Sequence, residues 1–196
     1  MEDKKLIEKD FEKAADILNC EVAVVKAVTE VESRGDGFLE DGRPKILFEG
    51  HVFWRELKKN QFNPEKFVSV TTADILYSTW TREHYKGGSD EYKRLDKAMN
   101  IDSECALKSA SWGMFQIMGF NHRLCNFDTV FSFVNAMKFS EFEHLKAFIN
   151  FVISSRLDDE LRQKQWAKFA KGYNGKGYKL NRYDEKLERA YKKYAK

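Results

Sequence analysis

The stretch that decides the fold is residues 27–35, with the sequence AVTEVESRG. Its apolar side chains continue those of the preceding turn at the i, i+3, i+4, i+7 spacing of a buried helical stripe, formed by Val24, Ala27, Val28 and Val31. Glu32 falls at the edge of this stripe, and Gly35 is typical of a residue that ends a helix. The pattern predicts an apolar helix over about residues 21–33 that ends on a carboxylate.

The predicted setting of Glu32 favours the neutral form of its carboxyl group. Apolar surroundings raise the pKa of a carboxyl group, and the negative pole at the C-terminal end of a helix acts in the same direction. A glutamate that stays protonated near neutral pH can deliver a proton as a general acid. The alternative is a solvated glutamate near a helix end, which is what most glutamates are, so this segment alone leaves both interpretations open.

Two later segments, taken together with this Glu-Ser pair, carry a resemblance. They are residues 109–119, SASWGMFQIMG, and residues 172–178, GYNGKGY. The three segments resemble the motifs of goose-type lysozymes and lytic transglycosylases. That superfamily has a catalytic Glu-Ser at a helix end, a core helix with a Gly-Leu-Met-Gln-like sequence, and a Tyr-Asn-Gly-like segment that lines the cleft.

A closer resemblance is to a family of phage and prophage N-acetylmuramidases, the endolysins that break host peptidoglycan. The similarity extends from about Val24 to about Tyr194. Its ordered runs are residues 31–33, 41–44, 46–51, 109–122, 173–175 and 181–183. Several ordered runs over almost the whole chain make a specific signal, whereas a lone Glu-Ser would be weak.

This resemblance implies a glycoside hydrolase that cleaves the bond between N-acetylmuramic acid and N-acetylglucosamine for host cell lysis, with Glu32 as the general acid. It implies that Gln116, Tyr173 and Asn174 line the substrate cleft, and we assign Ser33 and His51 to the substrate-binding residues as well. An ordinary Asn-Gly turn is the alternative for Asn174. Two competing hypotheses stay open: a lytic transglycosylase that leaves anhydro-muramoyl ends, and a non-catalytic glycan-binding module.

Glu49 is the candidate for a second catalytic group. Glycoside hydrolysis commonly uses a second carboxylate to stabilise or attack the positive sugar carbon. Glu49 follows the apolar run Ile46-Leu47-Phe48, so the alternative is that a strand simply ends there. His51 could orient Glu49 or contact substrate, although a structural histidine is the simpler interpretation.

The fold class expected is mainly α, a lysozyme-like helical bundle with one small β-hairpin beside the active-site cleft. The hairpin would pair residues 38–39 with residues 46–48 across an Asp-Gly turn. A core helix is predicted over about residues 109–118, whereas residues 69–90 lack clear periodicity and predict an irregular lobe. We expect residues 1–196 to form a single catalytic domain without a separate cell-wall-binding domain.

Composition excludes several classes of protein. The 196 residues are 42% hydrophobic and 14% aromatic, enough for one globular core, and no run of 18 apolar residues predicts a transmembrane helix. The net charge of +3 comes from scattered residues, which argues against a nucleic-acid-binding protein. No metal-ligand spacing or cofactor motif occurs, and the three cysteines predict free thiols.

These features lead to expectations about partners and location. The expected partners are the glycan strands of bacterial peptidoglycan, without nucleic acid, stable membrane association or a metal or other cofactor, and the expected state is a monomer. The N-terminus does not resemble a signal peptide. We therefore expect the protein to stay in the cytoplasm of the host bacterium and to act on the periplasmic wall after the membrane is permeabilised.

Overall fold

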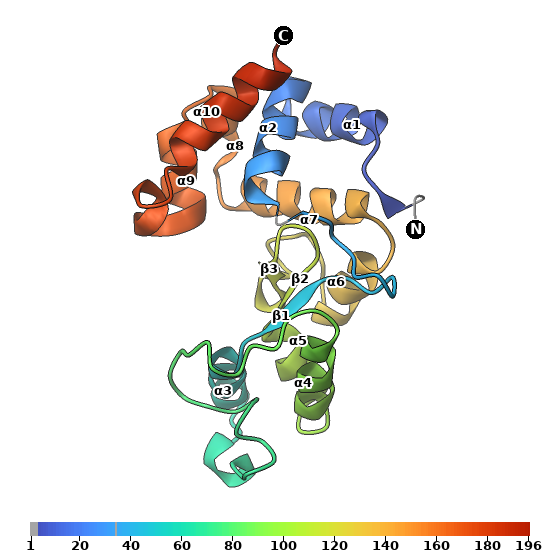
Figure 1. Cartoon of the computed structure of the whole chain (residues 1–196), viewed down its shortest axis with the longest axis vertical. Helices are drawn as coiled ribbons and strands as arrows, with labels where there is room; N and C mark the ends of the chain where they lie inside the picture. Colours follow the sequence, from blue (N-terminus) through green and yellow to red (C-terminus); the bar gives the residue numbers. More distant parts are fainter. Residues whose placement is uncertain (1–3, 34) are drawn as a thin grey trace.

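The structure, a computed structural model, describes residues 4–33 and 35–196. Figure 1 shows two groups of elements with helix α7 between them. Helices α1, α2 and α8–α10 form one group, and the sheet with α3, α4 and α5 forms the other. This arrangement confirms the expected mainly helical class. Among the described helices, none is both long enough and apolar enough to cross a bilayer.

The described residues contain ten α-helices, three 3-10 helices and three strands with residue bounds as follows. The α-helices are α1 Glu8–Leu18, α2 Val22–Glu32, α3 Gly50–Lys59, α4 Asp90–Met99, α5 Ser103–Lys108, α6 Val130–Met137, α7 Glu141–Ser154, α8 Asp158–Arg162, α9 Trp166–Asn174 and α10 Tyr183–Tyr194. The 3-10 helices are η2 Pro64–Phe67, η3 Gly119–Asn121 and η4 Gly175–Lys179. The strands are β1 Ile46–Phe48, β2 Ala110–Trp112 and β3 Ile117–Met118.

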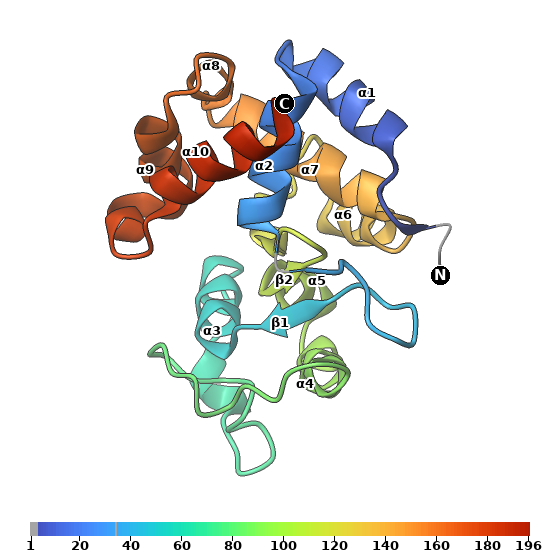
Figure 2. The same ribbon diagram turned by 45° about the horizontal axis from the view of Figure 1, so that its top comes forward.

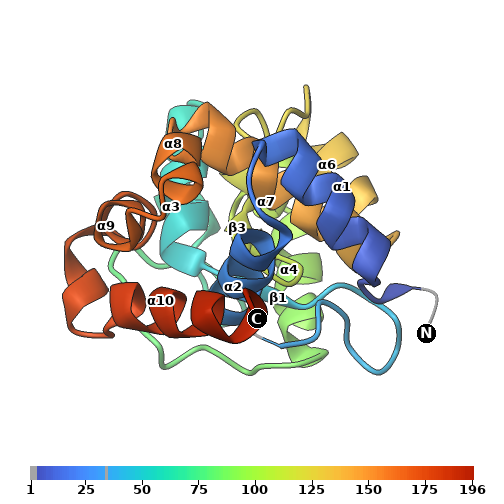
Figure 3. The ribbon, with the colours of Figure 1, turned by 90° about the horizontal axis from the view of Figure 1, so that it is seen from above.

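Helix α2 is the element that the opening sequence predicts, and it ends on Glu32. Its buried stripe includes Val24, Ala27 and Val28, none more than 1% exposed. Helix α10 packs along α2, as Figure 3 shows, and α1 covers another side. Ser33 leaves the helix in an extended conformation, so the last turn stops there. Figure 2 shows that the C-terminal end of α2 points toward the sheet.

The strands form one antiparallel sheet in the order β1-β2-β3. Leu47 pairs with Ser111, and Ser111 pairs with Met118 on its other side. The strand component is therefore larger than the single hairpin that the sequence predicts. The Asp-Gly turn does form, with an isolated bridge between Phe38 and Pro44, but β1 takes β2 as its partner.

The core helix predicted over residues 109–118 is wrong, because this segment is the β2–β3 hairpin. Gly113 and Gln116 have φ angles of +69° and +50°, which an α-helix cannot contain. A side chain at Gly113 would place its Cβ 2.9 Å from the ring of His144, so the glycine permits close packing against α7. The apolar residues of the segment are buried on several sides, and burial on all sides removes the periodicity that separates strand from helix.

A buried ion pair fixes the irregular segment, which has neither helix nor strand over residues 69–89. The side chains of Glu91 and Arg94 on α4 are 0% and 2% exposed, and Arg94 Nη1 lies 2.7 Å from Glu91 Oε2. Glu91 accepts hydrogen bonds from the backbone N–H groups of Lys86 and Gly87, while Arg94 donates to the carbonyl of Asp74. Both ends of the segment are thus held on one helix, although it has no regular structure.

Candidate active site

A pocket of about 270 Å³ lies between the two groups of elements. The helical side of its lining consists of Val31, Glu32, Phe151, Tyr173, Asn174 and Tyr183. The sheet side consists of Phe115, Gln116, Ile117, Met118 and Asn121. The structure therefore brings together three of the predicted site residues, Gln116, Tyr173 and Asn174, around Glu32.

Glu32 is the buried carboxylate of this pocket. It is the last residue of α2 and only 9% exposed. Burial raises its pKa to about 7, and this effect outweighs the hydrogen bond from Asn174 and the charge of Lys186, both of which favour the ionised form. Its position at the C-terminal pole of a helix also disfavours negative charge. A carboxyl group with this pKa is about half protonated at pH 7.

Asn174 makes the polar contact to Glu32. Its Nδ2 donates to Glu32 Oε1 at 3.0 Å across 142 residues of chain. Asn174 ends α9, and Gly175 follows with a φ of +72°, so the turn interpretation and the cleft interpretation both hold. Glu32 Oε1 is therefore held by this hydrogen bond.

Tyr173 is fixed by aromatic packing. Its ring stacks on Phe169 at 5.7 Å between centroids, and the rings of Phe148 and Phe151 meet it edge-on at 5.3 and 5.9 Å. Each such pair contributes to stability beyond the area it buries. The aromatic cluster holds the end of α9, and with it Asn174, against Glu32.

Gln116 supports the pocket from the turn between β2 and β3. Its Oε1 accepts from Ser111 Oγ at 2.8 Å, and its Nε2 donates to the carbonyls of Gly113 and Lys45 at 2.8 and 3.2 Å. The amide thus finds the backbone partners that a polar side chain in an apolar setting needs. Its hydrogen bonds stabilise the left-handed turn that forms one wall of the pocket.

Ser33, Glu49 and His51 do not line this pocket. Ser33 faces a separate hollow with Thr29 and Glu30 on another side of α2. Glu49 lies at the junction of β1 and α3, where its two carboxylate oxygens accept from Tyr85 Oη at 2.7 and 2.8 Å. His51 Nδ1 lies 3.3 Å from Glu49 Oε2.

The sequence analysis did not assign four of these residues to a site. Asn121, Phe151 and Tyr183 line the pocket of Glu32. Tyr85 contacts Glu49. Tyr183 falls in one of the runs that carry the family resemblance, so a signal for it was available. Tyr85 lies in the aperiodic segment, where nothing local distinguishes it from its neighbours. Within the described residues, no three His, Cys, Asp or Glu side chains are grouped as metal ligands.

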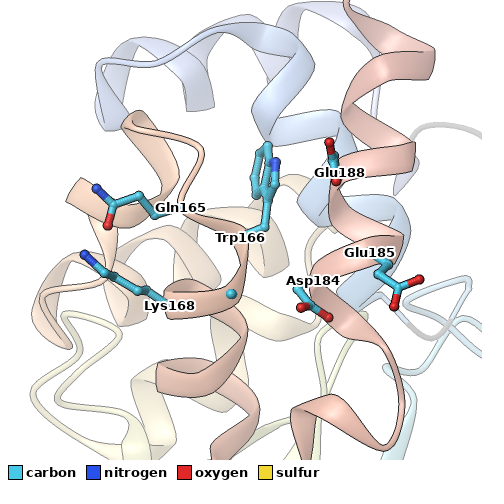
Figure 4. A pocket seen from close by; sticks show the side chains of 7 residues that line it. Gln165, Trp166, Lys168, Asp184, Glu185 and Glu188 are labelled. Atoms are coloured by element: carbon cyan, nitrogen blue, oxygen red, sulfur yellow. The ribbon is translucent and has the colours of Figure 1, made fainter.

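A second hollow of about 500 Å³ lies between α9 and α10, as Figure 4 shows. The indole of Trp166 forms one wall, and Asp184, Glu185 and Glu188 lie along α10. Arg182 pairs with Glu185 and lowers the pKa of that carboxyl group, which is the opposite of what a proton donor needs. The pKa of Glu32, by contrast, is raised by burial.

Comparison with known proteins identifies the chain. The family model described as "Muramidase: N-acetylmuramidase" matches residues 21–195. The chain belongs to the N-acetylmuramidase family. The muramidase is also similar to a solved structure, "Crystal structure of Burkholderia AP3 phage endolysin", with 45% sequence identity and a TM-score of 0.89 over 98% of this chain and 72% of that one.

No curated protein matches the muramidase. The two matches confirm the resemblance that the sequence motifs predict, and with it a peptidoglycan-degrading N-acetylmuramidase, an enzyme of the glycoside hydrolase class. Both matches therefore support an enzyme over a non-catalytic glycan-binding module.

Proposed function

We propose that this muramidase hydrolyses the bond between N-acetylmuramic acid and N-acetylglucosamine with Glu32 as the general acid. The observation that carries the proposal is a carboxyl group, 9% exposed at a helix end, whose pKa is raised to about 7 in a pocket between two groups of elements. A glycosidic oxygen is a poor leaving group until it is protonated, so a neutral carboxylic acid is the group the reaction needs.

The contacts of Glu32 support both halves of a proton transfer. Before transfer, burial keeps a large fraction of the carboxyl group neutral at pH 7. After transfer, the hydrogen bond from Asn174 stabilises the carboxylate that forms. The packed ring of Tyr173 holds Asn174 in place, and this arrangement avoids reorganisation during the reaction.

Glu49 is proposed as the second carboxylate. It directly precedes α3, where the N-terminal pole of the helix interacts favourably with negative charge, and Tyr85 donates to it. Strand β2 separates β1 from the pocket-lining strand β3, and neighbouring strands lie about 4.8 Å apart, so the backbone of Glu49 is roughly 10 Å from that wall. Inverting glycosidases hold their two carboxyl groups about 6.5–9.5 Å apart with room for a water between them, so this role requires the side chain of Glu49 to reach toward Glu32.

A lytic transglycosylase reaction is the second candidate, and the position of Glu49 favours it. Glu49 is not among the residues that line the pocket of Glu32, so a scheme with one acid fits the pocket. In that scheme the hydroxyl of the muramic acid attacks its own ring. The family match favours hydrolysis.

Product analysis separates the two reactions. Purified sacculi are digested, and the released muropeptides are analysed by mass spectrometry before and after borohydride reduction. Hydrolysis predicts a new reducing end that gains two hydrogens on reduction. Anhydro-muramoyl ends that resist reduction would contradict the hydrolase and support the transglycosylase.

The biological role proposed is host cell lysis, supported by the similarity to a phage endolysin. The protein would act as a monomer on the cell wall once the membrane is permeabilised. Turbidity of Gram-negative cells with and without a permeabilised outer membrane tests this role. Clearing only of permeabilised cells is expected, and absence of clearing in both would contradict it.

A further inference from the structure

The aperiodic segment, residues 69–89, contacts the candidate second carboxylate through one side chain. Tyr85 Oη donates to Glu49 Oε1 at 2.7 Å and lies 2.8 Å from Oε2, so the phenol bridges both oxygens. Both distances are typical of O–H···O hydrogen bonds. The side chain of Glu49 is only 14% exposed, so the phenol is a protein partner for a carboxylate with little access to solvent.

The residues on both sides of Tyr85 make contacts of their own. Glu91, fully buried on α4, accepts from the N–H groups of Lys86 and Gly87 directly after it. On the other side, the ring of His84 lies 4.8 Å from that of Tyr77. Tyr85 is thus held in place by its neighbours in the chain.

Tyr77 links the same segment to the start of α3. Its hydroxyl accepts from the backbone N–H of Gly50 at 3.3 Å, one residue after Glu49. A Cβ at Gly50 would lie 2.4 Å from the Tyr77 ring and 2.7 Å from the carbonyl oxygen of Ile75, so only glycine permits this close approach. The segment is packed against the peptide that carries Glu49.

His51 flanks the carboxylate on another side. Its Nδ1 is 3.3 Å from Glu49 Oε2 but makes no hydrogen bond within the described residues. Tyr85 is therefore the side chain that donates to Glu49 with good geometry. The orientation of the carboxylate depends on this phenol.

We propose that Tyr85 is a positioning residue that holds the carboxylate of Glu49 in one orientation for the reaction. This inference rests on the proposed role of Glu49. It makes residues 69–89 a part of the catalytic machinery, even though Tyr85 itself touches no reacting atom. Without the phenol, the carboxylate can rotate and take water as a partner. A misplacement of this kind costs on the order of tenfold to a hundredfold in kcat.

The test is a double-mutant cycle on soluble glycan strands with Tyr85→Phe, Glu49→Gln and both together. Tyr92→Phe is the matched control, because Tyr92 Oη donates a hydrogen bond to the carbonyl of Pro44 at 2.8 Å, away from Glu49. We expect Tyr85→Phe to lower kcat about tenfold or more with unchanged KM and melting temperature. In the Glu49→Gln background the same change should have less than about a twofold effect, because residues that act through one another are not additive.

Three outcomes would overturn the inference. If Glu49→Gln lowers kcat but Tyr85→Phe does not, Glu49 keeps its role and Tyr85 does not position it. If Tyr85→Phe lowers kcat equally in both backgrounds, the phenol acts independently of Glu49. If Glu49→Gln has wild-type kcat, the proposed role of Glu49 fails and the inference fails with it.

A second measurement does not depend on turnover. In protein labelled with ¹³C at the glutamate carboxyl carbons, the resonance that disappears in Glu49→Gln belongs to Glu49. We expect Tyr85→Phe to move that resonance and Tyr92→Phe to leave it in place. A resonance unmoved by Tyr85→Phe would contradict the contact on which the inference depends.

Discussion

Replacing Asn174 by Leu should extend the activity of the enzyme to higher pH. Asn174 donates to Glu32 Oε1, and this bond favours the ionised form of the acid. Leucine has a similar volume and no donor, so the carboxyl group stays buried and loses its partner. With desolvation unchanged and the hydrogen bond gone, the pKa of Glu32 can only rise.

The magnitude follows from the cost of one hydrogen bond to a charged group. Such a bond contributes about 1.5–3 kcal/mol, and one pKa unit corresponds to about 1.4 kcal/mol. The pKa of Glu32, about 7 in the wild type, should therefore rise by roughly one to two units. A general acid is active while protonated, so the basic limb of the kcat/KM profile should move up by the same amount.

The assay is the pH profile of kcat/KM on soluble glycan strands, from about pH 5 to 9.5, a window that spans the expected limbs. The maximum rate of Asn174→Leu can fall through lost substrate contacts without affecting the position of the limb. Asn60→Ala is the control, because Asn60 bonds to Glu56 and Cys105 at the end of α3 and should leave the limb in place. A limb that stays put or moves to lower pH in Asn174→Leu would refute the reasoning.

Three further predictions concern stability. Because the pKa of Glu32 is raised above its ordinary value of 4.5, the folded protein loses stability as pH rises from about 4.5 to 7. Glu32→Gln should remove this loss. Measured by urea unfolding, its free energy of unfolding should exceed that of the wild type by up to about 3 kcal/mol at pH 8 and by little at pH 4.5. Equal gains at the two pH values would contradict the prediction. Glu91→Gln should lower the free energy of unfolding by about 3–5 kcal/mol because it breaks a buried ion pair, and a loss below about 1 kcal/mol would be inconsistent with that pair. Reductant should leave activity and melting temperature unchanged, because Cys20, Cys105 and Cys125 are free thiols. Burial raises the pKa of the Cys20 thiol to about 11 and those of Cys105 and Cys125 to about 12. Thiol reagents should therefore react slowly until the chain unfolds.

The helix that carries Glu32 was predictable because its signal is local. An apolar stripe at helical spacing is buried where its helix packs, and α2, whose Val24 and Val28 are buried, packs against α1 and α10. A carboxylate at the edge of that stripe must then share its apolar surroundings. The prediction for Ser33 had no such support, because the backbone turns at that residue and directs it to a different hollow.

The β2–β3 hairpin was not predictable from the same kind of pattern. Its residues are apolar on several sides, and a stripe can be drawn through them at helical spacing by chance. The signals that oppose a helix are Gly113, which sequence analysis can flag, and the left-handed conformation of Gln116, which it cannot. The side chain of Gln116 stabilises that conformation through carbonyls that only the folded chain brings together.

The assembly of the site from distant segments was also beyond local patterns. Asn174 meets Glu32 across 142 residues, and Tyr85 meets Glu49 across 36. The family resemblance, which carries tertiary information indirectly, predicted that Asn174 lines the cleft, but it did not predict the hydrogen bond to Glu32. The contact between Tyr85 and Glu49 was not predicted either, because the aperiodic segment around Tyr85 shares no motif with that resemblance.

The most direct test of the account is the rate of muropeptide release by Glu32→Gln. The amide has nearly the size of the acid, so the folded variant should still bind sacculi, but it cannot give a proton to the glycosidic oxygen. Glu30→Gln is the matched control, because Glu30 is an exposed neighbour on α2 that pairs with Lys193 and Tyr194. The account predicts a loss on the order of a hundredfold to ten-thousandfold for Glu32→Gln and none for Glu30→Gln. Release by the folded Glu32→Gln variant at a rate close to that of the wild type would show that Glu32 is not the acid.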